Sequence, residues 1–183
     1  MNIQQTPLKG AFVIEPVMLE DERGFFARSW CQKEFAQHGF NPDLVQCNIS
    51  FNRRRGTLRG MHFQRPPHAE TKLVRCTTGS IFDVIVDLRV DSPTYLQWFA
   101  VELSASNRRM LYVPEQFAHG FQTLTDDAEV FYQMSQFHSP GDAAGLRWND
   151  PVTGIEWPVS SPILSDRDRD YPDFEPNQLA RAA

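Results

Sequence analysis

Short apolar runs separated by turn residues make up most of this chain, and this pattern constrains its fold more than any other feature. The strongest run, residues 81–88, is rich in β-branched residues and follows a turn that contains Gly79. Strands at this spacing, with little helix between them, are typical of an antiparallel sandwich, barrel or jelly roll. We therefore predict strands at 12–14, 44–51, 72–76, 81–88, 98–103, 110–113, 120–124 and 130–137.

Helix signals are few. Residues 29–38 are predicted to form one short helix, with Ser29 as its N-cap and Gly39 as its stop signal. The tail that starts at Asp142 is rich in proline, aspartate and tryptophan. We expect this tail to lie extended on the barrel, with one turn of helix near Asp166.

Composition narrows the class of protein. The 183 residues contain no linker or repeat, so we expect one domain over 1–183, with extended N- and C-terminal segments around its core. The net charge of −5 argues against a nucleic-acid partner, which would need a basic surface. Three widely spaced cysteines favour a reducing compartment. No run is long and apolar enough for a membrane, so we expect a cytoplasmic protein with no membrane partner.

The segment 59–64 combines an arginine, a glycine, a histidine and a glutamine, which is a poor composition for a core. A lone histidine is most often a buried residue bonded to a backbone carbonyl. Here polar and basic neighbours flank His62 on a predicted strand, and Lys72 opens the strand after it, so we favour a base in an anion-lined site. A base needs a partner to fix its tautomer. The aspartates of 165–168 offer one, but the local pattern does not choose between them.

Three more residues have both a structural and a functional interpretation. Lys72 either extends along the surface to place its ammonium in solvent, or points inward, where it would stabilise an oxyanion or enolate. His119 either lies on the rim of a turn or shares a cavity with His62. Tyr132 is either a packing residue, as most strand tyrosines are, or a proton donor.

The sequence gives no support to a metal site. Its five histidines form no H-x-H or H-x-x-H pair, and the cysteines do not cluster with them. The glycine-rich fingerprints G-x-G-x-x-G and G-x-x-x-x-G-K do not occur either. We therefore expect no metal ligands and none of the common nucleotide-binding loops.

Eleven short segments, which follow one another over nearly the whole chain, give a more specific indication. They are 23–26, 46–50, 58–64, 72–75, 83–89, 92–94, 103–107, 118–121, 148–151, 155–158 and 164–168. Each segment is weak alone, but their combination resembles the dTDP-4-dehydrorhamnose 3,5-epimerase family.

The resemblance implies an all-β, cupin-like jelly-roll barrel with a few short helices, working as a homodimer without metal or organic cofactor. Its substrate would be a nucleotide sugar linked to dTDP. His62 would be the base, Tyr132 the opposing acid and Asp168 the carboxylate that orients His62. Lys72 would lie near the C4 oxygen of the sugar, with Asp83 as its partner. The nucleotide diphosphate and sugar would be held by Arg23, Gln46, Asn48, Arg59, Lys72, His119 and Arg167.

The resemblance also implies a reaction. A 4-keto group acidifies the hydrogens on C3 and C5 of the sugar. His62 would remove a proton, Lys72 would stabilise the enolate, and Tyr132 would return a proton to the opposite face. Inversion at both carbons would convert dTDP-4-dehydro-6-deoxy-D-glucose to dTDP-4-dehydro-L-rhamnose, which is the work of an isomerase.

The chain departs from the family pattern at three positions. Arg28 stands where the family usually has glutamate, Ala143 where it tends to have an acidic residue, and Cys47 where a polar residue is usual. These departures leave the nucleotide open. Two alternatives remain: a 3- or 5-epimerase for a related 4-ketosugar, and a non-catalytic sugar-binding cupin. A binding module has no need for a base, an acid and an orienting carboxylate together, which favours the enzyme.

Overall fold

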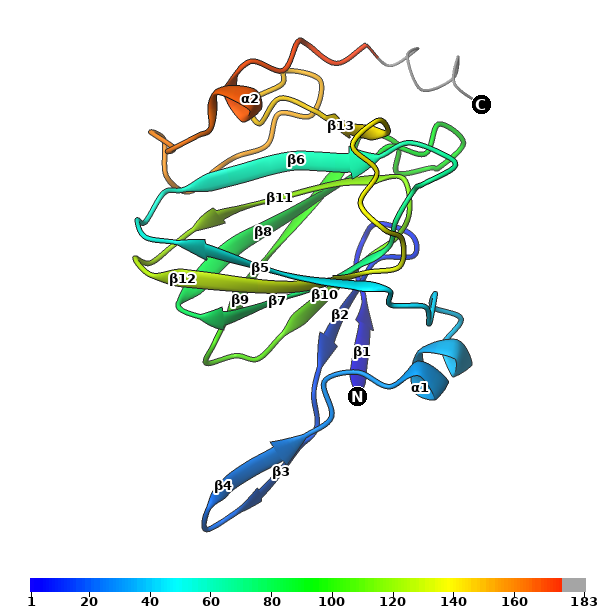
Figure 1. Cartoon of the computed structure of the whole chain (residues 1–183), viewed down its shortest axis with the longest axis vertical. Helices are drawn as coiled ribbons and strands as arrows, with labels where there is room; N and C mark the ends of the chain where they lie inside the picture. Colours follow the sequence, from blue (N-terminus) through cyan, green and yellow to red (C-terminus); the bar gives the residue numbers. More distant parts are fainter. Residues whose placement is uncertain (176–183) are drawn as a thin grey trace.

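The computed structural model describes residues 1–175, and its two large antiparallel sheets face each other (Figure 1). The six-stranded sheet has the order β1-β2-β10-β7-β12-β5. Its strands are β1 Asn2–Gln5, β2 Phe12–Glu15, β5 Gln46–Asn52, β7 Lys72–Thr78, β10 Met110–Val113 and β12 Ala128–Met134. The five-stranded sheet has the order β13-β6-β11-β8-β9. Its strands are β6 Leu58–Gln64, β8 Ser80–Asp87, β9 Trp98–Ser104, β11 Phe117–Thr123 and β13 Ala143–Gly145.

The apolar core lies between these two sheets, because alternate side chains of each strand point to the same face. Val74 and Val130 of the six-stranded sheet belong to one buried cluster with Ile81 and Ile85 of the five-stranded sheet. Burial of this face against a second sheet is what the alternating strand pattern requires. The predicted all-β jelly roll is confirmed.

All eight of the strands predicted by residue range are present, with ends that differ by up to three residues. The strand predicted around His62 is also present, as β6. The prediction did not include β1 or β13. It also did not include a small hairpin of β3 Met18–Asp21 and β4 Gly24–Ala27. This hairpin extends away from the two sheets in Figure 1, and its apolar residues Leu19 and Phe26 are exposed.

The two helices are short. The predicted helix at 29–38 is smaller than expected: α1 spans Gln32–Gln37, and Cys31, not Ser29, occupies its N-cap without a side-chain cap. Trp30 stays in the extended segment before the helix, where its ring packs edge-on against Phe35, the buried residue of α1. The turn expected near Asp166 is confirmed as α2, Asp166–Arg169. No helix within residues 1–175 is long and apolar enough to cross a membrane.

The C-terminal segment lies on the outside of the five-stranded sheet, as expected for the tail (Figure 1). Its first part, β13, pairs with β6 and places Gly145 beside His62. Further along, the amide of Leu58 donates to the carbonyl oxygen of Ile163 over 2.9 Å. These contacts bring α2, which is distant in sequence, against β6.

A pair of glycines sets the contact between β6 and β11. Gly60 has φ +136°, and a Cβ added to it would lie 2.5 Å from the Cα of Gly120. Only glycine allows two backbones to approach so closely. The register between the strands shifts at this point, between His119 and Phe121, and on one side of the shift His119 lies opposite His62.

Candidate active site

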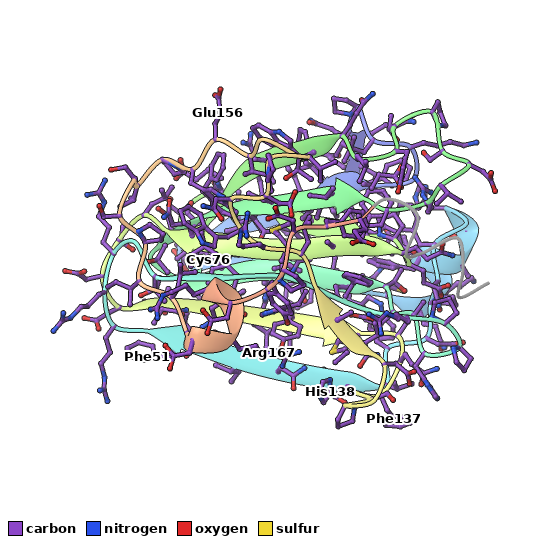
Figure 2. All side chains as sticks on the ribbon, turned by 90° about the horizontal axis from the view of Figure 1, so that it is seen from above. Phe51, Cys76, Phe137, His138, Glu156 and Arg167 are labelled. Atoms are coloured by element: carbon purple, nitrogen blue, oxygen red, sulfur yellow. The ribbon has the colours of Figure 1, made fainter. Side chains whose placement is uncertain are left out.

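One cavity of about 630 Å³ opens between the two sheets, a volume suited to a small-molecule ligand. Residues of β5, β6, β7, β11, β12, β13 and α2 line it. Nine of the ten predicted site residues lie on its wall: Gln46, Asn48, Arg59, His62, Lys72, His119, Tyr132, Arg167 and Asp168. Arg23 is the tenth and does not line it. Figure 2 looks down on α2 and shows Arg167 on this helix, with the labels of Phe51 and His138, which also line the cavity, on either side.

His62 and Asp168 form the first polar pair of the cavity. His62 Nε2 lies 2.7 Å from Asp168 Oδ1, although 106 residues separate them in the chain. Asp168 sits in α2, whose N-cap Ser165 accepts the Asp168 amide over 3.1 Å. Burial alone would raise the pKa of Asp168, but hydrogen bonds from His62, the Gly60 amide and Ser165 outweigh burial and hold this pKa below its ordinary value. Asp168 is therefore a carboxylate at neutral pH.

His119 and Asp83 form a second pair beside the first. His119 Nε2 lies 2.8 Å from Asp83 Oδ1, and both side chains are buried. The prediction that Asp83 partners Lys72 is therefore wrong. Asp83 lies on β8, which pairs with β11, the strand of His119. The Asp83 carboxylate is therefore bonded to His119 and not to Lys72.

The partner of Lys72 is Glu70, which the sequence prediction missed. Lys72 Nζ lies 2.9 Å from Glu70 Oε1, and both side chains are at least nine-tenths buried. The residues are two apart at the start of a strand, and side chains two apart on extended backbone point to the same side. That spacing was the signal available in the sequence. The structure supports the inward orientation of Lys72.

Tyr132 lies on β12 of the six-stranded sheet, and His62 lies on β6 of the five-stranded sheet. The two side chains therefore occupy opposite walls of the cavity. Burial raises the pKa of Tyr132 above its ordinary value; Arg59 opposes the rise and Glu70 adds to it. Tyr132 thus keeps its phenolic proton at neutral pH.

The remaining predicted residues form a polar rim. Gln46 and Asn48 project from β5 on one face and are joined by a 3.2 Å hydrogen bond from Gln46 Nε2 to Asn48 Oδ1. Arg59 Nε donates to Asn52 Oδ1 over 2.7 Å, and Arg167 Nε donates to the Tyr171 hydroxyl over 2.9 Å. Each guanidinium keeps further N–H donors for an anion in the cavity.

Among residues 1–175, no group of three or more histidine, cysteine, aspartate or glutamate side chains is placed to hold one metal ion. The cavity instead has an imidazole paired with a carboxylate, a phenol and basic side chains on its walls. Such a set suits proton transfer next to a carbonyl on an anionic ligand.

Comparison with known sequences identifies the family. A sequence model described as dTDP-4-dehydrorhamnose 3,5-epimerase matches residues 5–176. This chain belongs to that family. The predicted resemblance and the predicted enzyme class, an isomerase, are both confirmed.

Individual members of the epimerase family cover nearly the whole chain. The dTDP-4-dehydrorhamnose 3,5-epimerase of Shigella flexneri is 46% identical over 169 residues, which is 92% of this chain and 93% of that protein. The crystal structure of the Bacillus anthracis enzyme, with TDP and PPi bound, is 45% identical. The two structures align with a TM-score of 0.91, over 94% of this chain and 99% of the Bacillus anthracis chain. A 3′-monoepimerase from Streptomyces bikiniensis, in complex with dTDP-quinovose, is 31% identical. It has a TM-score of 0.87, over 97% of this chain and 89% of its own.

The three departures from the epimerase pattern lie in different places. Arg28 is exposed and lies 3.5 Å from Glu34, away from the cavity of its own chain. Cys47 is exposed and does not line the cavity, whereas its neighbours Gln46 and Asn48 do. Ala143 does line the cavity, and the carboxylate of the adjacent Asp142 is bonded to His68.

Proposed function

We propose that this epimerase converts dTDP-4-dehydro-6-deoxy-D-glucose to dTDP-4-dehydro-L-rhamnose by inverting C3 and C5. One observation carries the proposal: His62, backed by Asp168, and Tyr132 lie on opposite walls of a single cavity that also holds the Lys72 ammonium. Inversion needs a base on one face of a carbon and an acid on the other. The names of the relatives, among them the Shigella flexneri enzyme at 46% identity, support the same reaction.

His62 is the base in this proposal. Asp168 accepts the Nε2–H of the imidazole, so Nδ1 is the nitrogen that carries the lone pair. This tautomer is stable because Asp168 remains ionised at neutral pH. When Nδ1 takes the proton from C3 or C5, the imidazolium lies against a carboxylate that stabilises it.

Lys72 and Tyr132 complete the proton transfer. Removal of the proton leaves negative charge on the C4 oxygen, and the buried Lys72 ammonium stabilises this charge more strongly than water would. Tyr132 then donates its phenolic proton to the opposite face of the carbon, and its raised pKa keeps that proton available. His119, Arg59, Arg167, Gln46 and Asn48 hold the sugar and the diphosphate.

We also infer that the chain works as a homodimer through the β3–β4 hairpin. Val17, Met18, Leu19, Phe25 and Phe26 leave an apolar surface exposed on and beside this hairpin. In the described chain β5 is an edge strand with the exposed residues Ile49 and Phe51. A second copy of the hairpin would cover this apolar edge and bring its Arg23 to the partner's cavity.

The domain organisation and the compartment are inferences of the same kind. The six-stranded sheet joins β1 to strands as late as β12, and the tail packs on β6, which supports one domain over residues 1–175. The last part of the predicted domain over 1–183, residues 176–183, lies outside the described residues. Cys31, Cys47 and Cys76 form no disulfide with one another, and this agrees with a reducing cytoplasm.

Proton NMR of the protein with dTDP-4-dehydro-6-deoxy-D-glucose in deuterium oxide tests the reaction. We expect deuterium to enter both C3 and C5. Deuterium at one carbon only would replace the proposal by a single-site epimerase. No exchange, with the sugar nucleotide still bound, would mean another nucleotide or a sugar-binding protein without catalysis.

A further inference from the structure

A buried carboxylate on the cavity wall has no part in the proton transfer described above. This residue, Glu70, lines the cavity together with Lys72, His62 and Tyr132, and its side chain is only 4% exposed. Burial of a charge is costly unless the charge is paired and hydrogen-bonded. Glu70 is paired with Lys72 and accepts a hydrogen bond from the Gln64 amide, and Lys72 lines the cavity as well. We therefore look for a role of Glu70 in the reaction of this site.

The surrounding backbone fixes the position of the Glu70 carboxylate. Oε2 accepts the amide of Gln64 over 3.1 Å, and Oε1 lies 2.9 Å from Lys72 Nζ. Next to Glu70, the Thr71 amide donates to Ser135 Oγ over 2.8 Å, and the Ser135 amide donates to the Thr71 carbonyl over 3.0 Å. The carboxylate is thus held between β6 and the start of β7.

The hydrogen bonds of Lys72 leave one donor for a ligand. An ammonium has three N–H groups. One is directed to Glu70 Oε1, and a second to the carbonyl oxygen of His62 over 3.3 Å. Within residues 1–175 Lys72 has no third acceptor, and Lys72 lines the cavity. The third N–H is therefore available to an oxygen of the bound sugar.

We propose that Glu70 is a positioning residue: it keeps Lys72 as an ammonium and orients the free N–H of that ammonium toward the C4 oxygen of the substrate. This inference rests on the proposed function, because it assigns the C4 oxygen to Lys72. The carboxylate acts through Lys72 and does not touch the reacting carbons. Its negative charge stabilises the protonated lysine at a buried position, where desolvation favours the neutral amine.

Several other charged or titratable groups surround the cavity and contribute to any dependence on pH. They are Arg59 and His62 of β6, His119 of β11, with Asp83 of β8 behind it, Tyr132 of β12, His138, and Arg167 and Asp168 of α2. Glu70 also favours the protonated form of Tyr132. Loss of the Glu70 charge therefore acts on the lysine and on the tyrosine in the same direction.

Two variants separate the charge of Glu70 from its position. Glu70→Gln keeps the size and a hydrogen-bond acceptor but removes the charge. Glu70→Asp keeps the charge but withdraws it from Lys72 by one methylene. Glu15→Gln is the matched control, because it removes a carboxylate from a 2.8 Å ion pair with Arg109 that lies away from the cavity.

The experiment measures kcat and KM for dTDP-4-dehydro-6-deoxy-D-glucose between pH 6 and 10. For Glu70→Gln we expect the alkaline limb of kcat to move to lower pH by about one unit, with KM within about threefold of wild type. For Glu70→Asp we expect an unmoved limb and a kcat lower by about tenfold, because the ammonium is misplaced. Glu15→Gln should match the wild type.

An alkaline limb in Glu70→Gln that coincides with the wild-type limb would overturn the inference and leave a merely structural ion pair. If that variant does not fold, a wild-type kcat in Glu70→Asp would overturn it instead. NMR of the ¹³C-labelled lysine side chains adds a readout that needs no turnover. The Lys72 signal, assigned with Lys72→Arg, should titrate at lower pH in Glu70→Gln. An inactive wild type would count against the proposed reaction alone, and this NMR titration would still decide the role of Glu70.

Discussion

Two histidine–aspartate pairs lie side by side across β6 and β11, and they differ in how far each imidazole is exposed. The distances are nearly equal, 2.7 Å for His62–Asp168 and 2.8 Å for His119–Asp83. The His62 side chain is 39% exposed and the His119 side chain 9%. The same chemical pair is thus widely open to a ligand in one case, and in the other it presents only a small part of the imidazole to the cavity.

The difference follows from where each carboxylate comes from. Asp83 lies on β8, directly beside β11, and is completely buried. Asp168 lies on α2, which the tail brings over β6 from outside the sheet. Asp168 is bonded to the Nε2 atom of His62, and the imidazole stays open to the cavity. A general base needs a partner on one side of its ring and open space on the other, and His62 meets both conditions better than His119 does.

The largest expected effect comes from replacing the two imidazoles in turn. His62→Asn removes the proposed base, and we expect kcat to fall by at least about a thousandfold. His119→Asn removes a ligand contact, and we expect mainly a higher KM, with kcat reduced about tenfold or less. Steady-state kinetics measure both, and circular dichroism checks that both variants fold. A larger loss of kcat in His119→Asn would reverse the assignment of the two pairs.

The next effect concerns the group on the wall opposite His62. Tyr132→Phe removes the proposed proton donor but leaves the proposed base, His62, intact. We expect epimerisation to fall by about a hundredfold or more, while exchange of the sugar C–H with solvent falls much less. NMR in deuterium oxide follows both processes in one sample. Equal loss of exchange and epimerisation would argue against Tyr132 as the acid.

Replacing the two carboxylates sharpens the comparison further. Asp168→Asn should lower kcat about tenfold to a hundredfold, because the imidazolium loses its counter-charge. Asp83→Asn should lower the free energy of unfolding by about 1–3 kcal/mol, because the buried hydrogen bond between His119 and this side chain is weakened. Kinetics and urea unfolding of both variants separate catalysis from stability. Identical profiles for the two variants would remove the distinction between the pairs.

The pH dependence of stability gives a smaller effect at Asp168. Its pKa in the folded chain is depressed, so Asp168 contributes stability above its unfolded pKa of about 3.9. This contribution is lost as the pH falls through the lower folded value. We therefore expect the stability advantage of wild type over Asp168→Asn to be present at pH 6 and to shrink as the pH falls below about 4. Urea unfolding at several pH values measures it, and an advantage that grows on acidification would be the wrong sign.

The smallest effect is expected at Arg28, far from both pairs. Its side chain is 63% exposed and its ion pair with Glu34 is long, so Arg28→Glu should change the unfolding free energy by less than about 1 kcal/mol. Because Arg28 does not line the cavity of its chain, we expect no change in the preference among dTDP, CDP and GDP sugars. Competition assays with the three nucleotides measure this. A changed preference would place Arg28 at the nucleotide, by way of the partner's cavity.

Much of the fold was predictable because apolar, β-branched runs between turn residues indicate strands from the local sequence alone. Residues 81–88 and 110–113 read as strands without any tertiary information, and both form them. The hairpin that contains Phe25 and Phe26 was not predicted as strands, since its apolar residues are not buried in the described chain and show no buried alternation.

The site residues also differ in how well the sequence predicted them. Local pattern identified His62, Lys72 and His119, which stand on predictable strands or directly beside them. The carboxylate partners of these residues were harder to predict, because such pairs depend on how strands and helices pack together. The local pattern did not choose Asp168 over its neighbour in 165–168, and the prediction gave Asp83 to Lys72 although β8 and β11 bring it to His119.

Deuterium exchange into the sugar tests the central claim most directly, with wild type, His62→Asn and His119→Asn compared in deuterium oxide. Each protein is mixed with dTDP-4-dehydro-6-deoxy-D-glucose, and proton NMR follows the C3 and C5 signals. The account predicts exchange at both carbons in wild type, slower exchange at both in His119→Asn, and none in His62→Asn above the rate without protein. Exchange that persists in His62→Asn and disappears in His119→Asn would contradict it, and would assign the base to the buried pair.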